Sequence, residues 1–205
     1  MAAMVEVSPI QRVCVYCGSG AGENPAYAVA ARQLGTILAD NGIGLVYGGG
    51  CIGLMGEVAR AVLEAGGHVT GIIPGFLTER EIMLKDVQDL IVVEGMHERK
   101  HLMFDKSDAF VALPGGIGTL EELVEQLTWA QLGRHEKPVV LANIEGFWDP
   151  LLRLFAHMQE NSFIRRDAAL KLAVIDQVQD ILPAIEKHMR PRAEEAEAEA
   201  IDIKF

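Results

Sequence analysis

The sequence predicts an α/β fold in which helices cover both faces of one doubly wound, parallel β-sheet. Short apolar runs alternate with segments of helical periodicity from one end of the chain to the other, which is typical of this fold class. Glycine-rich turns follow three of the apolar runs, at the carboxyl ends of strands where such sheets bind ligands. The chain has 205 residues, enough for one well-buried domain and too few for two comfortable ones. We therefore expect a single domain.

The first strand–helix–strand unit spans residues 12–47. Residues 12–16 (RVCVY) form a short run of β-branched and aromatic residues, which favours a strand. Residues 26–41 have the apolar spacing of a helix and end at Asn41-Gly42, a typical helix stop. Residues 44–47 (GLVY) favour a second strand.

The next unit follows a glycine-rich segment at residues 48–53. We expect a helix from there to about residue 65, because Gly66-Gly67 favours a helix end. Residues 68–73 (HVTGII) favour a third strand, which Pro74 breaks.

The rest of the chain repeats the alternation. We expect a loop with a short helix at 75–89, strands at 90–93, 109–113, 138–142 and 172–175, and helices at 96–107, 148–161 and 178–190. A further helix starts in the glycine-containing segment before residue 123 and includes the helical pattern at 123–132. This succession predicts a Rossmann-like doubly wound sheet with helices on both faces, in a domain at residues 11–190. Residues 1–10 form an N-terminal extension, and residues 191–205 (PRAEEAEAEAIDIKF) form an acidic, alanine-rich tail.

Composition narrows the class of protein. The net charge of −11 argues against a nucleic-acid polymer as partner, since such binders carry a basic surface. No apolar run approaches the ~18–20 residues of a membrane span, and the N-terminal MAAMVEVSPIQ lacks the features of a signal peptide. The three cysteines, Cys14, Cys17 and Cys51, do not make a disulfide framework. These features predict a reduced, cytoplasmic protein that binds no membrane.

The most informative segment is residues 114–122 (PGGIGTLEE), which lies between an apolar run and a helical pattern. In this strand–turn–helix context, unpaired backbone N–H groups lie at the positive end of the helix dipole, so the turn suits a phosphate. Glu121 and Glu122 fall in the predicted first turn, although a carboxylate there repels phosphate. We infer that one of them serves another part of the ligand.

A structural interpretation of the same segment stays open. Thr119-x-x-Glu122 fits a capping box, with Thr119 as N-cap and Glu122 at the third helical position. Acids in a first turn favour the helix dipole by about 0.3–1 kcal/mol without any ligand. Capping alone does not require three glycines in four residues, which favours the ligand interpretation.

A second glycine pattern, Gly48-x-Gly50-x-x-Gly53, matches the dinucleotide fingerprint between a strand and a helix. A dehydrogenase would place Asp or Glu at the end of the next strand to hold the ribose hydroxyls, and here that strand ends in Ile-Ile-Pro. Leu54-Met55 stands where a Walker A motif requires Lys-Ser/Thr. Two interpretations therefore stay open: backbone that faces a nucleotide, which includes Gly49, and close packing of the helix against the strand.

Cys14-Val-Tyr-Cys17 has the spacing of a redox or zinc pair. Strand positions three apart face opposite sides, so we expect both side chains to pack in the core.

Ser19, in the Gly-Ser-Gly turn that follows, either donates to a phosphate or a base or is a simple turn residue. The histidines show no metal-ligand spacing, and we predict no metal site: His68, His97, His101, His135, His157 and His188.

A basic cluster, Met96-His-Glu-Arg99-Lys100, opens the helix that precedes the strand of the PGGIGTLEE segment. Such charges usually lie on a solvated helix face. Cations at a helix start are unfavourable to its dipole, however, so an anionic partner should compensate them. Arg99 can form a bidentate pair with a phosphate or a carboxylate, and Lys100 offers a point charge.

Together the two motifs resemble those of a known family. Pro114-Gly-Gly-x-Gly-Thr-x-x-Glu122 with Met96-x-x-Arg99-Lys100 is similar to the signature of the LONELY GUY family, the cytokinin riboside 5′-monophosphate phosphoribohydrolases. Related chains have often carried the label "lysine decarboxylase". The resemblance covers roughly residues 11–190 and includes Cys17-Gly-Ser, Tyr47-Gly-Gly-Gly, Gly53-Leu-Met-Gly and Thr128-Trp-Ala-Gln-Leu-Gly.

The resemblance implies hydrolysis of the N-glycosidic bond of an N6-modified adenosine monophosphate, without a cofactor, to give the free base and ribose 5-phosphate. It implies Arg99 and Glu122 as the catalytic pair. The implied binding residues are Glu81, Arg99, Lys100, Gly116, Ile117, Gly118, Thr119, Leu120, Glu121, Glu122 and Thr128, to which our own interpretation of the turns adds Ser19 and Gly49. It also implies a homodimer with the sites near the subunit interface, so that a neighbouring chain completes each site.

From their positions in the sequence alone, two of these residues would have ordinary structural roles. Thr128 would be a core or packing residue, and Glu81 would be an exposed acid.

The main alternative function is a non-enzymatic carrier of a nucleotide or of molybdenum cofactor on the same scaffold. Arg99 and Glu122 together favour an enzyme, since a mere binder needs no acid beside a phosphate. Pyridoxal-phosphate decarboxylation requires a Schiff-base lysine in a cofactor pocket, which nothing around Lys100 indicates. The preferred base, plain or N6-prenylated adenine, stays open.

Overall fold

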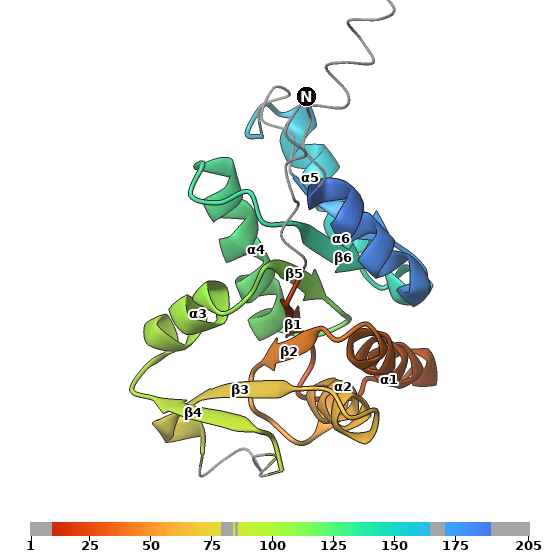
Figure 1. Ribbon diagram of the computed structural model, residues 1–205. Helices are drawn as coiled ribbons and strands as arrows, with labels where there is room; N and C mark the ends of the chain where they lie inside the picture. The colour runs from red at the N-terminus through yellow and green to blue at the C-terminus, as the bar shows by residue number, and fades with distance from the viewer. Residues whose placement is uncertain (1–9, 79–83, 85, 165–170, 190–205) are drawn as a thin grey trace, which may run out of the picture.

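Seven parallel strands form one sheet in the order β4-β3-β2-β1-β5-β6-β7. The computed structural model describes residues 10–78, 84, 86–164 and 171–189 (Figure 1). The strands are β1 (Arg12–Tyr16), β2 (Gly44–Tyr47), β3 (Val69–Pro74), β4 (Asp89–Val93), β5 (Ala109–Ala112), β6 (Val139–Ala142) and β7 (Ala173–Ile175). The predicted tail at 191–205, and all of the predicted extension at 1–10 except Ile10, lie outside the described residues.

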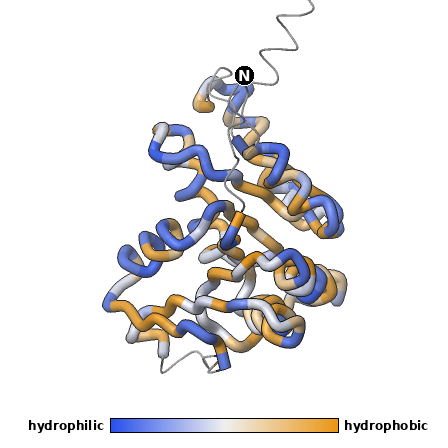
Figure 2. Tube along the Cα trace, viewed as in Figure 1, coloured by the Kyte–Doolittle hydropathy of each residue, from blue (hydrophilic) through white to orange (hydrophobic). Residues whose placement is uncertain are grey.

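Helices cover both faces of the sheet, which confirms the predicted fold class (Figure 1). One face carries α1 (Pro25–Asp40), α2 (Gly53–Glu64) and α6 (Ile181–Met189), and the other carries α3 (Met96–Asp105), α4 (Ile117–Gln131) and α5 (Asp149–Glu160). The period-2 alternation of the strands separates two cores. On β1, Val13 and Val15 face the first set of helices, whereas Cys14 and Tyr16 face the second. Figure 2 shows the apolar strands enclosed by helices of mixed polarity.

The observed element bounds differ from the expected ones by a few residues. β3 does not break before Pro74 but ends on it, in register with Val93 of β4. Pro74 lies beyond Gly71, the last β3 residue that pairs with β2, so the N–H that it lacks is not needed on that side. The expected last helix divides into a 3₁₀ turn, η3 (Val178–Asp180), and α6. The short helix expected after β3 is the 3₁₀ turn η1 (Gly75–Leu77), and a further 3₁₀ turn, η2 (Ile144–Gly146), precedes α5.

The direction of chain winding reverses between β1 and β5. β1 pairs with β2 on one side and with β5 on the other, so the turns that leave β1 and β5 lie next to each other at the carboxyl edge of the sheet. The Gly18 N–H donates to the Pro114 carbonyl at 3.0 Å and joins them. The PGGIGTLEE segment therefore lies at the switch point, where open α/β sheets form their ligand crevice. In the described ranges, no helix is long and apolar enough to cross a membrane.

Candidate functional site

The N-terminus of α4 is open to solvent. Gly116 is its N-cap residue and carries no capping side chain. The Leu120 N–H donates to the Gly116 carbonyl at 3.0 Å, but the N–H groups of Ile117, Gly118 and Thr119 meet no acceptor among the described residues. A Cβ built on Gly116 or Gly118 would meet no atom within 4 Å. Three free donors and open space at a helix start make a site for an anion.

The capping-box interpretation, which the sequence left open, is wrong. α4 begins at Ile117, so Thr119 is its third residue rather than its N-cap, and Glu121 and Glu122 lie in the second turn instead of the first. The helix starts early because Gly116, not a threonine, takes the extended cap conformation. The Thr119 hydroxyl packs back against Gly115, where a Cβ would lie 2.2 Å from it. Glu122 therefore lies about one helical turn beyond Thr119, whose N–H is the last of the free donors.

Arg99 of α3 and Glu122 of α4 form a buried ion pair. Each residue is 8% exposed. Arg99 Nη1 donates to Glu122 Oε1 at 2.6 Å, and Arg99 Nε donates to the Ile72 carbonyl near the end of β3 at 3.1 Å. Arg99 thus contacts a carboxylate, one of the two partners that the sequence allowed for it. Removing either charge would leave the other buried and unpaired, which is strongly destabilising.

Burial raises the pKa of the Glu122 carboxyl above its ordinary value, and the Arg99 guanidinium opposes this rise without cancelling it. The neighbouring Glu121 carboxylate adds to the rise, and Lys100 reduces it. The raised pKa makes this carboxylate a stronger base than that of an exposed glutamate, while the Arg99 guanidinium favours its ionised form.

Lys100 finds its anions on α4. Its Nζ donates to Glu121 Oε1 at 2.5 Å and to Glu125 Oε1 at 2.9 Å. Burial lowers the pKa of Lys100, but the two hydrogen bonds outweigh burial and the pKa is raised. The anionic partners expected for the basic cluster are therefore carboxylates of the next helix. Sequence reasoning missed Glu125, although its spacing of four from Glu121 places both on one side of a helix.

The N-terminus of α2, which follows the second glycine pattern, is closed. The Gly18 carbonyl accepts from the N–H groups of Leu54 at 3.1 Å and Met55 at 3.3 Å. Gly53 has a left-handed φ of +59°, and a Cβ on it would lie 2.2 Å from the Ser19 carbonyl oxygen. Of the two interpretations left open for this segment, the contacts favour close packing.

The remaining predicted residues lie in different surroundings. Ser19 is exposed beside the open turn, whereas Gly49 is buried. Thr128 is exposed rather than in the core, and its hydroxyl donates to the Val124 carbonyl at 2.7 Å. Glu81 lies outside the described residues. Cys14 and Cys17 are buried in opposite cores, as expected, and burial raises the pKa of both thiols far above the ordinary value.

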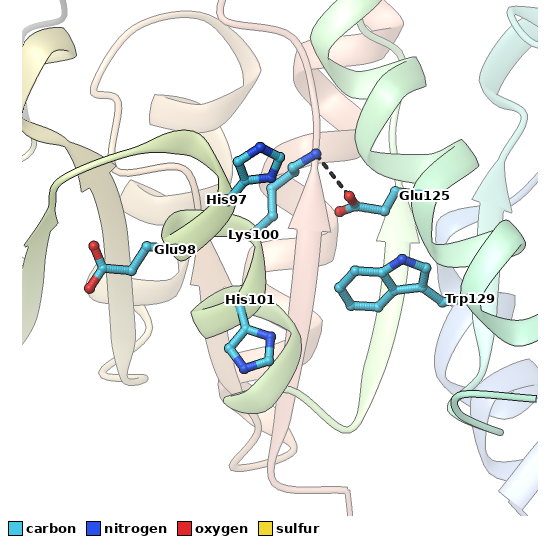
Figure 3. A pocket seen from close by; sticks show the side chains of 6 residues that line it. All are labelled: His97, Glu98, Lys100, His101, Glu125 and Trp129. Atoms are coloured by element: carbon cyan, nitrogen blue, oxygen red, sulfur yellow. Dashed lines mark hydrogen bonds and ion pairs between the residues drawn. The ribbon is translucent and has the colours of Figure 1, made fainter.

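A cavity of about 400 Å³ lies between α3 and α4 (Figure 3), lined by His97, Glu98, Lys100, His101, Glu125 and Trp129. Figure 3 shows the hydrogen bond from Lys100 to Glu125 at one end of it. Neither Arg99 nor Glu122 lines this cavity, although Glu98 and Lys100, the chain neighbours of Arg99, do. Within the described ranges, no three His, Cys, Asp or Glu residues are grouped to hold a metal ion.

The fold and the site define a doubly wound α/β protein with an open helix start at its switch point and a buried Arg–Glu pair beside it. The sequence model of a family described as "possible lysine decarboxylase" matches residues 55–185. The chain is 53% identical over 161 residues to "cytokinin riboside 5′-monophosphate phosphoribohydrolase LOG" of Oryza sativa subsp. japonica, covering 78% of this chain and 66% of that protein. It is 46% identical to "cytokinin riboside 5′-monophosphate phosphoribohydrolase LOG1" of Arabidopsis thaliana, covering 91% of this chain and 87% of that protein.

The chain therefore belongs to the LONELY GUY family, as its motifs predicted. Among solved structures it is similar to a molybdenum cofactor carrier protein of Chlamydomonas reinhardtii, with a TM-score of 0.68, 25% identity and coverage of 88% of this chain and 98% of that one. A molybdenum cofactor binding protein of Rippkaea orientalis has a TM-score of 0.67 and 24% identity, covering 87% and 97%. These likenesses confirm the fold.

Proposed function

We propose that this protein is a phosphoribohydrolase, which cleaves the N-glycosidic bond of adenosine 5′-monophosphates modified at N6 and releases the free base and ribose 5-phosphate. The observation that carries the proposal is the buried Arg99–Glu122 pair one turn from the free N–H groups of α4. The identity of 46–53% to cytokinin riboside 5′-monophosphate phosphoribohydrolases supports the same reaction.

The 5′-phosphate binds at the start of α4. The N–H groups of Ile117, Gly118 and Thr119 donate to its oxygens, and the helix dipole favours its charge. Lys100 is already held by two carboxylates, so the backbone, rather than this ammonium, is the principal anchor. An anchored phosphate fixes the ribose one helical turn farther along, beside Glu122.

Glu122 acts on the ribose. As the N-glycosidic bond breaks, its electron pair leaves with the base nitrogen and positive charge develops at C1′ of the sugar, as in other glycoside hydrolyses. A carboxylate beside C1′ stabilises this charge and orients or deprotonates the water whose oxygen bonds to C1′. The raised pKa of Glu122 makes it a stronger base than an exposed glutamate. Arg99 keeps the carboxylate in place and favours its ionised form.

The alternative is a carrier of a nucleotide or of molybdenum cofactor, since proteins of those names share the fold. A carrier gains nothing from a buried carboxylate near a phosphate, because the negative charge weakens binding. The Arg99–Glu122 pair therefore favours catalysis.

The direct experiment incubates the purified protein with AMP, other nucleoside monophosphates and N6-isopentenyl-AMP, and quantifies the free base and the ribose 5-phosphate. The two products should form in equal amounts. Release of base from at least one adenine nucleotide supports the proposal and gives the base preference. Tight binding of a nucleotide without any release would favour the carrier.

We further propose that two copies of the chain pair through α4 and act in the cytoplasm. The exposed side of this helix carries Ile117 (82% exposed), Val124 (40%) and Leu132 (72%), at spacings that place them on one face. Thr128, implied in binding, is ~14 Å along the helix from Thr119, so it reaches a ligand at the α4 start more readily from a second, antiparallel α4.

Leu132→Glu should convert the dimer into a monomer, as measured by light scattering, and should lower the activity. A wild-type protein that is monomeric and fully active would contradict the pairing.

A further inference from the structure

We propose that Gly48 is a positioning residue for Arg99: the missing side chain at Gly48 makes the space in which the guanidinium lies while it holds Glu122. The inference rests on the proposed function for its catalytic consequence, but its structural part stands on packing alone. Gly48 directly follows β2, and Arg99 reaches it from α3, across the carboxyl edge of the sheet.

The contact between Gly48 and Arg99 is closer than a side chain allows. A Cβ on Gly48 would lie 2.4 Å from Arg99 Nη2, 3.0 Å from Met55 Sδ and 3.6 Å from Arg99 Cζ. The first of these distances forces a displacement. The Met55 thioether is flexible and can move by the few tenths of an ångström that the second requires.

Arg99 cannot move away without losing a hydrogen bond. Its Nε donates to the Ile72 carbonyl and its Nη1 donates to Glu122 Oε1. The guanidinium is a rigid plane, so a shift of Nη2 rotates or translates the other two nitrogens as well. A methyl group at position 48 would thus displace the cation that pairs with Glu122.

Backbone conformation does not explain the glycine at this position. Gly49 and Gly53 have left-handed φ angles of +82° and +59°, which disfavour other residues, but Gly48 is not among the glycines with positive φ. The space taken by Arg99 is therefore what excludes a side chain at Gly48.

The displacement would also change the proton affinity of Glu122. The charged groups that influence its pKa are Arg99, Lys100 and Glu121. Cys14 and Tyr16 lie in the core on the α4 side of β1, and Cys17, at the end of β1, lies in the opposite core; burial keeps all three protonated. Moving the Arg99 cation away raises the pKa of Glu122 further, so the acid limb of the activity profile moves to higher pH.

The test is a double-mutant cycle of Gly48→Ala and Arg99→Lys. A lysine ends near the position of Cζ and lacks Nη2, so it removes the atom that the alanine methyl would strike. Gly95→Ala is the matched control, because Gly95 caps the helix that carries Arg99 and a Cβ on it would meet no atom within 4 Å. Urea unfolding and the pH profile of kcat/KM are measured for each protein.

Gly48→Ala should lower kcat/KM by about 30- to 100-fold and move the acid limb up by about half a pH unit or more. In the wild-type background, Gly48→Ala should also lower the urea concentration at the midpoint of unfolding. In the Arg99→Lys background, Gly48→Ala should change this midpoint little and kcat/KM by less than about twofold. Gly95→Ala should leave kcat/KM and the acid limb unchanged and lower the urea midpoint only slightly, because alanine is a poorer N-cap than glycine.

Equal effects of Gly48→Ala in both backgrounds would overturn the inference, as would an active Gly48→Ala protein with an unmoved acid limb. If Gly48→Ala alone fails to fold, recovery of folding by Arg99→Lys supports the inference and continued misfolding overturns it. The unfolding cycle requires no activity, so a protein that hydrolyses no nucleotide would refute the proposed function while the cycle still tests Gly48.

Discussion

Two glycine-rich turns of this protein share a local sequence pattern and differ in what surrounds them. Both leave a buried strand at the carboxyl edge of the sheet and lead into a helix, α2 after β2 and α4 after β5. At α2 the N–H groups of Leu54 and Met55 donate to the carbonyl of Gly18. At α4 the N–H groups of Ile117, Gly118 and Thr119 meet no acceptor in the part of the chain that the structure describes.

The difference lies in the third glycine turn, which follows β1 and lies between the other two. Its backbone presents the carbonyl of Gly18 to α2 and the N–H of Gly18 to the turn before α4. A carbonyl oxygen accepts hydrogen bonds from the free N–H groups at the start of a helix and so occupies them. A neighbouring N–H group cannot accept, so it leaves those donors available for an anion. A glycine pattern therefore predicts a tight turn, and a neighbouring segment decides whether the turn binds a phosphate.

The largest expected effect distinguishes a catalytic site at the start of α4 from a site that only binds an anion. Glu122→Gln should reduce release of ribose 5-phosphate by about 10³-fold, because the amide cannot stabilise the cationic sugar or accept a proton. Nucleotide affinity, measured by calorimetry, should change by less than about threefold, since the backbone donors stay. Glu121→Gln is the matched control, because its carboxylate is more exposed and pairs with Lys100; it should retain most of the activity. Equal losses in both variants would contradict the assignment of Glu122.

The next effect concerns the phosphate. Charge-assisted hydrogen bonds contribute about 1.5–3 kcal/mol each, so the nucleoside should be turned over at least about 100-fold less efficiently than its 5′-monophosphate. The comparison is of kcat/KM for the same base with and without the phosphate. Similar efficiencies would mean that the open turn before α4 is not the anchor.

Much of the fold could be predicted because its signals are local. Apolar runs, helical spacing and glycine stops gave the strands and helices to within a few residues, including the short β7. The pairing of the basic cluster with an anion also followed from a local argument, that cations at a helix start need compensation.

The parts that failed depend on contacts distant in sequence. The capping-box interpretation failed because Gly116, and not Thr119, is the N-cap of α4. The closure of α2 depends on Gly18, which belongs to another strand–helix turn. The exposure of Thr128 depends on which side of α4 meets the sheet, and the burial of Glu122 depends on α3. A pattern within a single segment contains none of this information.

Two glycine-to-alanine substitutions contrast the turns through stability. Gly53→Ala should destabilise the protein by about 2 kcal/mol or more, since it combines a left-handed φ with a clash against the Ser19 carbonyl. Gly118→Ala should stabilise it by about 0.5–1 kcal/mol, because the helical position is unobstructed. The added methyl enters the phosphate space, so KM for the nucleotide should rise by about tenfold. Urea unfolding and steady-state kinetics measure both; a Gly118→Ala protein of unchanged KM would argue against a phosphate there.

The most direct measurement follows the backbone amides of both helix starts by NMR while ribose 5-phosphate is added. This product carries the anchoring phosphate and has no bond left to cleave. The account predicts large downfield shifts of the Ile117, Gly118 and Thr119 amide protons, with little change at Leu54 and Met55. Large shifts at Leu54 and Met55, with the α4 amides unmoved, would contradict it.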